Sequence, residues 1–286
     1  MNENCLTVRS VTKSFPKFSL DNLSFVLPKG YIMGLVGSNG AGKTTTIKLI
    51  LNMLKKEQGN ISVLGFDSVK NERKIKQNIG VVFDTNFFVE EWTISDTEKA
   101  LSPFYDEWSH KTFTDMLDKF QISLKMKIGS LSRGMQMRLM LAVAFSHNAK
   151  LLLLDEPTSG LDPLTRDGLL EMLQDYIKDG EKSVLFSTHI TTDLERVADY
   201  ITVLEHGKLV FTGSTEDLLK AYYLIKGTPE ELTQDLNNRI IGLRLTSMGF
   251  EGLIKADESN SNKRYVLDTP TIDDIVVCVS KGGGKI

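Results

Sequence analysis

The segment GSNGAGKT, residues 37–44, constrains the fold of this chain more than any other feature. It follows a predicted strand over 31–36 and precedes a predicted helix over 44–54, where apolar residues have helical spacing. Glycines let the backbone bend so that several N–H groups converge on one concavity, and the helix directs the positive end of its dipole there. The pattern GxxxxGK[ST] in this setting predicts a phosphate-binding loop in an α/β domain.

Side chains of the loop supply the rest of a phosphate site. Lys43 provides a full positive charge for the β- and γ-phosphates of a nucleotide, and the Thr44 hydroxyl is a ligand for Mg²⁺. The predicted phosphate-binding residues are Gly37, Ser38, Asn39, Gly40, Ala41, Gly42, Lys43, Thr44 and Thr45.

Short strands and helices alternate along most of the chain, which predicts an α/β fold with a mainly parallel sheet. A hairpin over 201–212 turns at His206 and Gly207, and Thr93 and Asp162 each suit a helix N-cap. The predicted strands cover residues 6–11, 20–27, 31–36, 79–83, 151–154 and 183–187. The predicted helices cover residues 44–54, 93–120, 137–145 and 162–180.

Residues 219–286 differ from the rest of the chain, residues 1–218, in their pattern of predicted strands and helices. Their pattern predicts a strand over 222–225, a helix over 231–241, two further strands and a helix over 272–279. We expect a small, separate α+β domain here.

Two acids directly follow a predicted buried strand. Residues 151–154 are four leucines, and Asp155 and Glu156 come next. Parallel strands deliver their carboxyl ends to the ligand crevice of an α/β sheet, where Asp155 would reach a Mg²⁺ ion and Glu156 would polarise an attacking water. The alternative is a strand that ends in solvated acids, and the phosphate loop upstream favours the catalytic interpretation.

Composition excludes several classes of protein. The 286 residues carry a formal charge of -3 and are 41% hydrophobic, which predicts a folded core and argues against a nucleic-acid-binding surface. No apolar run reaches the roughly 18 residues of a membrane span. The two cysteines, Cys5 and Cys278, lie near opposite ends of the chain, so a disulfide framework is excluded and a reducing cytosol is favoured.

Further motifs give the chain a resemblance to ATPases of the ATP-binding cassette (ABC) family. LSRGM at 131–135 resembles the LSGGQ signature, SGLD at 159–162 resembles the D-loop, and a histidine after a β run resembles the switch histidine. An aromatic residue precedes the phosphate loop where the family places one against adenine. The matching residues are Phe15, Leu131, Ser132, Arg133, Gly134, Met135, Ser159, Gly160, Leu161, Asp162 and His189.

The resemblance implies an ATPase that uses Mg²⁺ and has an antiparallel β subdomain and a helical subdomain. It implies a dimer of identical or sister cassettes, in which Ser132 and Gly134 of one subunit contact the γ-phosphate bound by the other. Glu156 and His189 are the implied catalytic residues. Two alternatives stay open: Ser132 and Asp162 suit plain helix N-caps, and a lone histidine is more often structural. We expect the others, His110, His147 and His206, to be surface or structural residues.

Two departures from the family pattern affect the expected site. The family usually has a glutamine after the strand over 79–83, where this chain has Asp84, a further candidate ligand for Mg²⁺. In the signature, Arg133 replaces a glycine and Met135 replaces a glutamine.

The resemblance also implies a separate transmembrane permease, which would hold the chain at the cytoplasmic face of the cell membrane. In similar proteins the permease docks on the helical subdomain, and residues 86–121 here are rich in aromatic residues. We expect most of these in a core and some in an exposed groove. The cassette together with residues 219–286 is most similar to subunits of bacterial exporters of peptides, antibiotics or lipids.

Two other classes of function are weaker alternatives. A soluble ABC ATPase that acts on nucleic acid or ribosomes usually has two cassettes or long coiled coils, and the sequence contains neither. A P-loop GTPase would need an NKxD base-recognition motif, which the sequence also lacks.

Overall fold

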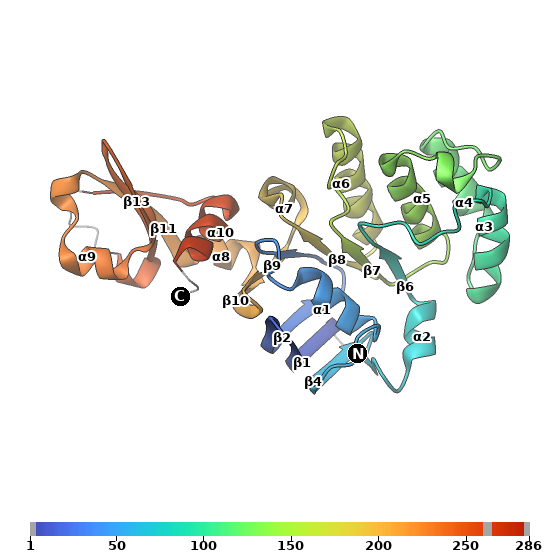
Figure 1. The fold of residues 1–286 in the computed structure, drawn as a ribbon, viewed down its shortest axis with the longest axis horizontal. Coiled ribbons are helices and arrows are strands. Elements are labelled where there is room, and N and C mark those ends of the chain that lie inside the picture. The colour runs from blue at the N-terminus through green and yellow to red at the C-terminus, as the bar shows by residue number, and fades with distance from the viewer. Residues whose placement is uncertain (1–3, 260–264, 283–286) are drawn as a thin grey trace.

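The computed structural model describes residues 4–259 and 265–282. Two sheets organise these residues (Figure 1), one with the strand order β5-β4-β1-β2-β10-β9-β3-β8-β7-β6 and one with the order β12-β13-β11-β14. The strands are β1 (Asn4–Phe15), β2 (Phe18–Pro28), β3 (Ile32–Val36), β4 (Gln58–Val63), β5 (Phe66–Asp67), β6 (Ile79–Val82), β7 (Leu151–Asp155), β8 (Ser183–Thr188), β9 (Tyr200–Glu205), β10 (Lys208–Ser214), β11 (Tyr222–Gly227), β12 (Ile241–Thr246), β13 (Gly249–Lys255) and β14 (Val266–Asp268).

The helices pack against the large sheet, within the helical segment after β6, or beside the C-terminal sheet. They are α1 (Lys43–Ile50), α2 (Glu72–Gln77), α3 (Ile94–Leu101), α4 (His110–Lys119), α5 (Arg133–Phe145), α6 (Pro163–Ile177), α7 (Thr191–Val197), α8 (Thr215–Ala221), α9 (Gln234–Arg239) and α10 (Ile272–Lys281), with short 3-10 turns η1 (Ser102–Phe104), η2 (Ile128–Ser130), η3 (Pro229–Glu231) and η4 (Ala256–Glu258). Within the described ranges, no helix has the length and apolar character needed to cross a membrane.

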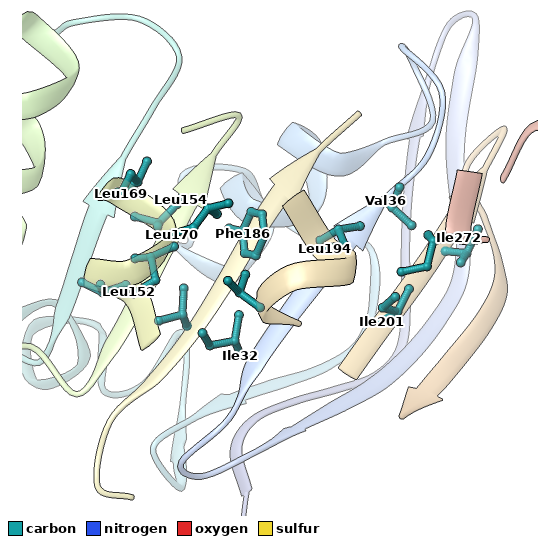
Figure 2. Packing of buried hydrophobic residues seen from close by; sticks show 14 of the residues in the cluster. Ile32, Val36, Leu152, Leu154, Leu169, Leu170, Phe186, Leu194, Ile201 and Ile272 are labelled. Atoms are coloured by element: carbon teal, nitrogen blue, oxygen red, sulfur yellow. The ribbon is translucent and has the colours of Figure 1, made fainter. Parts of the chain in front are cut away.

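The inner strands of the large sheet are parallel and wholly buried. β3, β7 and β8 are buried at every position, and β3 pairs with β8 and β9 while β7 pairs with β6 and β8, all in parallel. One apolar cluster lies between this sheet and α5, α6 and α7 (Figure 2), and a second includes α1. The predicted α/β fold is confirmed, and the register brings the carboxyl ends of β3, β7 and β8 to one edge.

Antiparallel strands complete the other half of the sheet. β1 pairs with β2 and β4, and β9 pairs with β10 in the predicted hairpin. The turn requires glycine: Gly207 has φ 77°, and a Cβ there would lie 1.8 Å from the Ser19 carbonyl oxygen. The Gly207 N–H donates to the Ala41 carbonyl at 3.1 Å, so the hairpin turn touches the phosphate loop.

The predicted helical segment over 93–120 is divided into α3, η1 and α4. Thr93 and Asp96 form the expected capping box at the start of α3. Phe113 is fully buried in a cluster with Ile94 and other apolar residues, which confirms a core role for part of the aromatic segment. Phe104 in η1 is 71% exposed.

Several predicted boundaries are wrong. The helix over 44–54 ends at Ile50, because Asn52 adopts the left-handed conformation with φ 56°. The helix over 231–241 is replaced by η3 and the short α9, since the Thr233 side chain caps α9 and residue 241 already begins β12. Three strands, not two, follow before the last helix, α10.

The four-stranded sheet has a small core of its own, and α10 joins the core of the large sheet. Ile225, Leu236 and Ile254 belong to the small core. Ile272 of α10 is fully buried in the large cluster, and Figure 2 shows it beside Ile201. The division at residues 218/219 falls within α8.

Candidate nucleotide-binding site

A pocket of about 690 Å³ lies at the carboxyl edge of the parallel strands, within the range typical of ligand sites. It brings together most of the phosphate loop and all three predicted carboxylates. The lining residues are Lys17, Phe18, Asn39, Gly40, Gly42, Lys43, Thr44, Thr45, Asp84, Asp155, Glu156 and His206.

The phosphate loop presents unpaired backbone donors and one buried ammonium group. Gly42 caps α1 in a left-handed conformation with φ 111°, and no side chain or first-turn acid competes for the N–H groups of that turn. Lys43 is 6% exposed, and its Nζ donates to the Gly37 carbonyl at 2.9 Å. The same Nζ lies 3.3 Å from Glu156 Oε1. This arrangement suits a multiply charged anion such as a nucleotide phosphate.

Thr44 and Asp155 form a compact oxygen cluster. The Thr44 hydroxyl donates to Asp155 Oδ2 at 2.8 Å, and the Ser187 hydroxyl donates to Asp155 Oδ1 at 2.6 Å. Mg²⁺ is commonly held by one or two protein oxygens together with substrate phosphates, so this donor set fits the ion. No group of three or more His, Cys, Asp or Glu side chains in the described ranges could hold a metal unaided.

Glu156 links Lys43 of the phosphate loop to His189. Its Oε2 lies 2.7 Å from His189 Nδ1, while Oε1 faces Lys43. The residue has φ 52°, a left-handed conformation that costs energy and is fixed by hydrogen bonds from its N–H to the Ser187 carbonyl and hydroxyl. The carboxylate therefore has a defined position, where it could accept a proton from a water beside a bound phosphate.

Asp84 lines the pocket and also forms an ion pair with Arg133. Both side chains are about half exposed, at 46% and 59%. The structure thus joins two of the three residues at which the chain departs from the family pattern.

The residues that resemble the signature and the D-loop lie outside the pocket and close to each other. Ser132 is exposed and accepts a hydrogen bond from the Met135 N–H as the N-cap of α5. A Cβ built on Gly134 would lie 3.7 Å from Leu161. Asp162 is the N-cap of α6, and hydrogen bonds from Thr165 hold the pKa of Asp162 below its usual range. The D-loop residues Ser159 and Gly160 complete this loop.

Phe15 stacks on Phe18, and of these two rings Phe18 lines the pocket. The ring centroids are 6.2 Å apart. Phe18, Lys17 and His206 line the pocket but were not predicted from the sequence, and His206 was expected to be a surface or structural residue. The turn at His206 and Gly207 was the available signal, because it packs on the strand that begins at Phe18.

Ser187 was also missed. Its position opposite Asp155 in the parallel register of β7 and β8 brings the two side chains together. The available sequence signal was a polar residue directly after the apolar run at 184–186.

Comparisons with known proteins agree with this geometry. Residues 20–159 match the family model described as ABC transporter. The ABC transporter ATP-binding protein NatA of Bacillus subtilis (strain 168) is 30% identical over 223 residues, which cover 76% of this chain and 86% of NatA. The Nod factor export ATP-binding protein I of Rhizobium sp. (strain N33) is 32% identical over 244 residues, covering 81% and 80% of the two chains.

A solved structure shows the same fold. It is a dimeric ATP-binding cassette in a post-hydrolysis state with ADP and Pi, with a TM-score of 0.66 at 22% identity, over 73% of this chain and 98% of the other. The mixed α/β sheet with its helices is therefore the ABC ATPase fold. Together with the sequence relatives, this shows that the chain belongs to the ABC transporter family as one of its ATP-binding, ATP-hydrolysing subunits.

Proposed function

We propose that this chain binds and hydrolyses Mg-ATP between two cassettes and thereby powers a separate transmembrane permease at the cytoplasmic face of the cell membrane. The main support for this proposal is the position of Glu156, which contacts both Lys43 of the phosphate loop and His189. These contacts support Glu156 as the base, with the ammonium group of Lys43 at one carboxylate oxygen and the His189 ring at the other.

Each site residue has a proposed role. The N–H groups of residues 37–45 and Lys43 hold the phosphates, while Thr44 and Asp155 hold Mg²⁺, and Asp84 of the same pocket is a further candidate ligand. When bound, Mg²⁺ neutralises charge on the phosphates. Glu156 accepts a proton from the attacking water, and His189 donates a hydrogen bond to the γ-phosphate. Phe15 and Phe18 offer aromatic faces for adenine.

The separation of the signature from the pocket supports a dimer. Ser132 is exposed, and residues 132–135 do not line the pocket of their own chain. A second cassette, identical or a sister subunit, would supply Ser132 and its neighbours to close the site over the γ-phosphate. The exposed N-terminal end of α5 suits an anion in that position.

A groove beside β6 supports a permease partner. It has a volume of about 740 Å³ and is lined by residues of α2 and by residues 103–106, including Phe104. Gln77 in this groove accepts a hydrogen bond from the Asp106 N–H at 3.0 Å, and β6 runs from there to Asp84 at the nucleotide pocket. A displacement of Phe104 would therefore be transmitted to Asp84 through a single short strand.

We propose export as the direction of transport. The support is the Nod factor export protein, which is 32% identical to this chain. The substrate exported by this chain is a separate question, to be answered by its permease.

Isolation of the tagged chain from native membranes tests the partner. We expect a polytopic membrane protein to co-purify with the parent chain and to be lost from Phe104→Asp. Leu245→Asp is the matched control, because Leu245 is also a large exposed apolar residue, 68% exposed on β12. Recovery of no membrane protein with the parent would reject the transporter assignment, and equal recovery with Phe104→Asp would reject the groove as its docking site.

A further inference from the structure

Glu205, at the end of β9, is a buried carboxylate that connects the phosphate loop to the C-terminal helix. Its side chain is 4% exposed. The Ser38 hydroxyl of the phosphate loop lies 3.2 Å from both carboxylate oxygens, and the Ser280 hydroxyl of α10 donates to Oε2 at 2.9 Å. His206, whose side chain is 78% exposed, is its ion-pair partner among the described residues. A buried carboxylate is costly unless hydrogen-bonded, so the two serine hydroxyls are its main compensation inside the protein.

The other end of α10 contacts the segment that follows His189. The Thr191 hydroxyl donates to Asp273 Oδ1 at 3.0 Å, and the Ile272 N–H donates to Glu195 Oε1 at 2.9 Å. Thr191 and Glu195 belong to α7, which begins two residues after His189. One helix outside the cassette thus contacts both Glu205, which bonds Ser38, and α7, which follows His189.

Apolar packing fixes α10 in this position. Ile272 is 0% exposed and belongs to the same cluster as Val36, the residue directly before the phosphate loop. Figure 2 shows Ile272 on the same side of the sheet as Ile201 and Val36 and near both. Because interiors are close-packed, a shift of α10 would be transmitted to the start of the loop.

We propose that α10 tunes ATP affinity by positioning the phosphate loop through the chain Ser280–Glu205–Ser38. Glu205 acts as a positioning residue: Ser280 fixes one side of its carboxylate, and the carboxylate fixes Ser38 and the backbone of the loop. The C-terminal sheet, which holds α10, is then a regulatory element whose position changes the ATP affinity of the nucleotide site. This proposal rests on the proposed role of residues 37–45 in holding the phosphates.

The test compares hydroxyl deletions in the full chain. We expect Ser280→Ala to raise the KM and Kd for Mg-ATP by roughly 3- to 10-fold, the value of about one hydrogen bond, with kcat little changed. Ser280→Thr keeps the hydroxyl and is expected to retain parental affinity. Ser259→Ala is the matched control, because the Ser259 hydroxyl bonds only the Ala256 carbonyl, also outside the cassette, among the described contacts.

A double-mutant cycle distinguishes positioning from general loosening. If Ser280 acts through Glu205 on Ser38, then Ser38→Ala with Ser280→Ala weakens ATP binding no more than the more damaging single change. Melting temperatures establish that each variant is folded. Unchanged affinity in Ser280→Ala, or losses that multiply in the double variant, would overturn the proposal while leaving the ATPase function intact. A parent chain without ATP binding would instead remove the proposed function and this inference together.

Discussion

Asp84 and Arg133 form an ion pair that joins the loop after β6 to the first turn of α5. In the ABC pattern these positions belong to a glutamine and a glycine, so one departure accompanies the other. Arg133 also approaches the D-loop, since a Cβ built on Gly160 would lie 3.8 Å from its guanidinium group. One arginine thus lies close to both the loop after β6, which lines the nucleotide pocket, and the D-loop.

Substitutions of the two residues of this ion pair should have opposite effects on the Mg²⁺ dependence of ATPase activity. Arg133→Ala releases the Asp84 carboxylate toward the metal and should lower the Mg²⁺ concentration for half-maximal ATPase activity, whereas Asp84→Asn should raise it. We expect shifts of about 2- to 5-fold, because a half-exposed pair is worth at most about 1 kcal/mol. The double variant should behave like Asp84→Asn. Identical Mg²⁺ titrations for the parent and Asp84→Asn would exclude a metal role for Asp84.

Glu156→Gln should separate binding from hydrolysis. The amide has the same shape but cannot accept the proton of the attacking water, so we expect ATP to bind and phosphate release to fall at least about 100-fold. Equilibrium ATP binding and single-turnover phosphate release measure the two steps. Glu171→Gln on the exposed face of α6 is the matched control. A Glu156→Gln chain that turns over at the parental rate would remove the proposed base.

Two inactive variants should complement each other if the site lies between cassettes. Lys43→Ala disables the phosphate loop, and loses the ATP-induced rise in melting temperature, but keeps its signature. Ser132→Ala keeps its phosphate loop but disables the signature. In a mixed dimer one site is intact, so mixing should restore activity that neither has alone, roughly a quarter of the parental rate with random pairing of two independent sites.

Activity in the mixture that never exceeds the sum of the two variants would contradict a shared site. Lys111→Ala mixed with Ser132→Ala gives the matched reference, because Lys111 is 85% exposed and distant from the pocket lining.

The parts of the site that the sequence predicted are those encoded by short local patterns. The loop at 37–44 and the acids after β7 depend only on neighbouring residues, and so do the N-caps at Thr93 and Asp162. Ser187 and Glu205 could not be predicted in this way, because strand register and a contact with α10 give them their roles.

The fold shows the same division between local and long-range effects. The parallel core was predictable because its strands are continuous apolar runs. The helix over 231–241 was wrong because Thr233 starts a new helix, and the apolar residues that suggested continuation belong to a strand that pairs with β13. Sequence spacing alone does not distinguish these outcomes over such short segments.

His147 should make stability fall in mild acid. Burial lowers the pKa of His147 below its ordinary value of about 6.5, although its ring nitrogens face the carbonyls of Val143 and Ile79. Below about pH 6.5 the unfolded chain binds a proton that the folded chain resists, so the free energy of unfolding decreases as pH falls toward the lowered pKa. Urea unfolding at pH 7.5 and 5.5 should show a smaller difference in His147→Gln than in the parent. Equal differences would assign the acid sensitivity to other groups.

Removal of residues 222–286 should destabilise the cassette. The cut removes Ile272, Ile275 and Val279, each at most 1% exposed in the large cluster, and burial of such a side chain is worth about 1.5–3 kcal/mol. It uncovers Val36 and Ile201, so we expect a lower urea midpoint and weaker ATP binding. Equal stability and affinity in the shortened chain would show that residues 219–286 form an independent unit.

Two matched substitutions locate the cause of that loss. Ile272→Ala opens a cavity beside Val36, whereas Leu236→Ala opens one in the small core of the C-terminal sheet, with both side chains at most 1% exposed in the parent. Each should lower stability by about 2–5 kcal/mol. Only Ile272→Ala should also weaken ATP binding, because its cavity adjoins the strand that carries the phosphate loop. Equal affinities in the two variants would mean that α10 stabilises the cassette without acting on its nucleotide site.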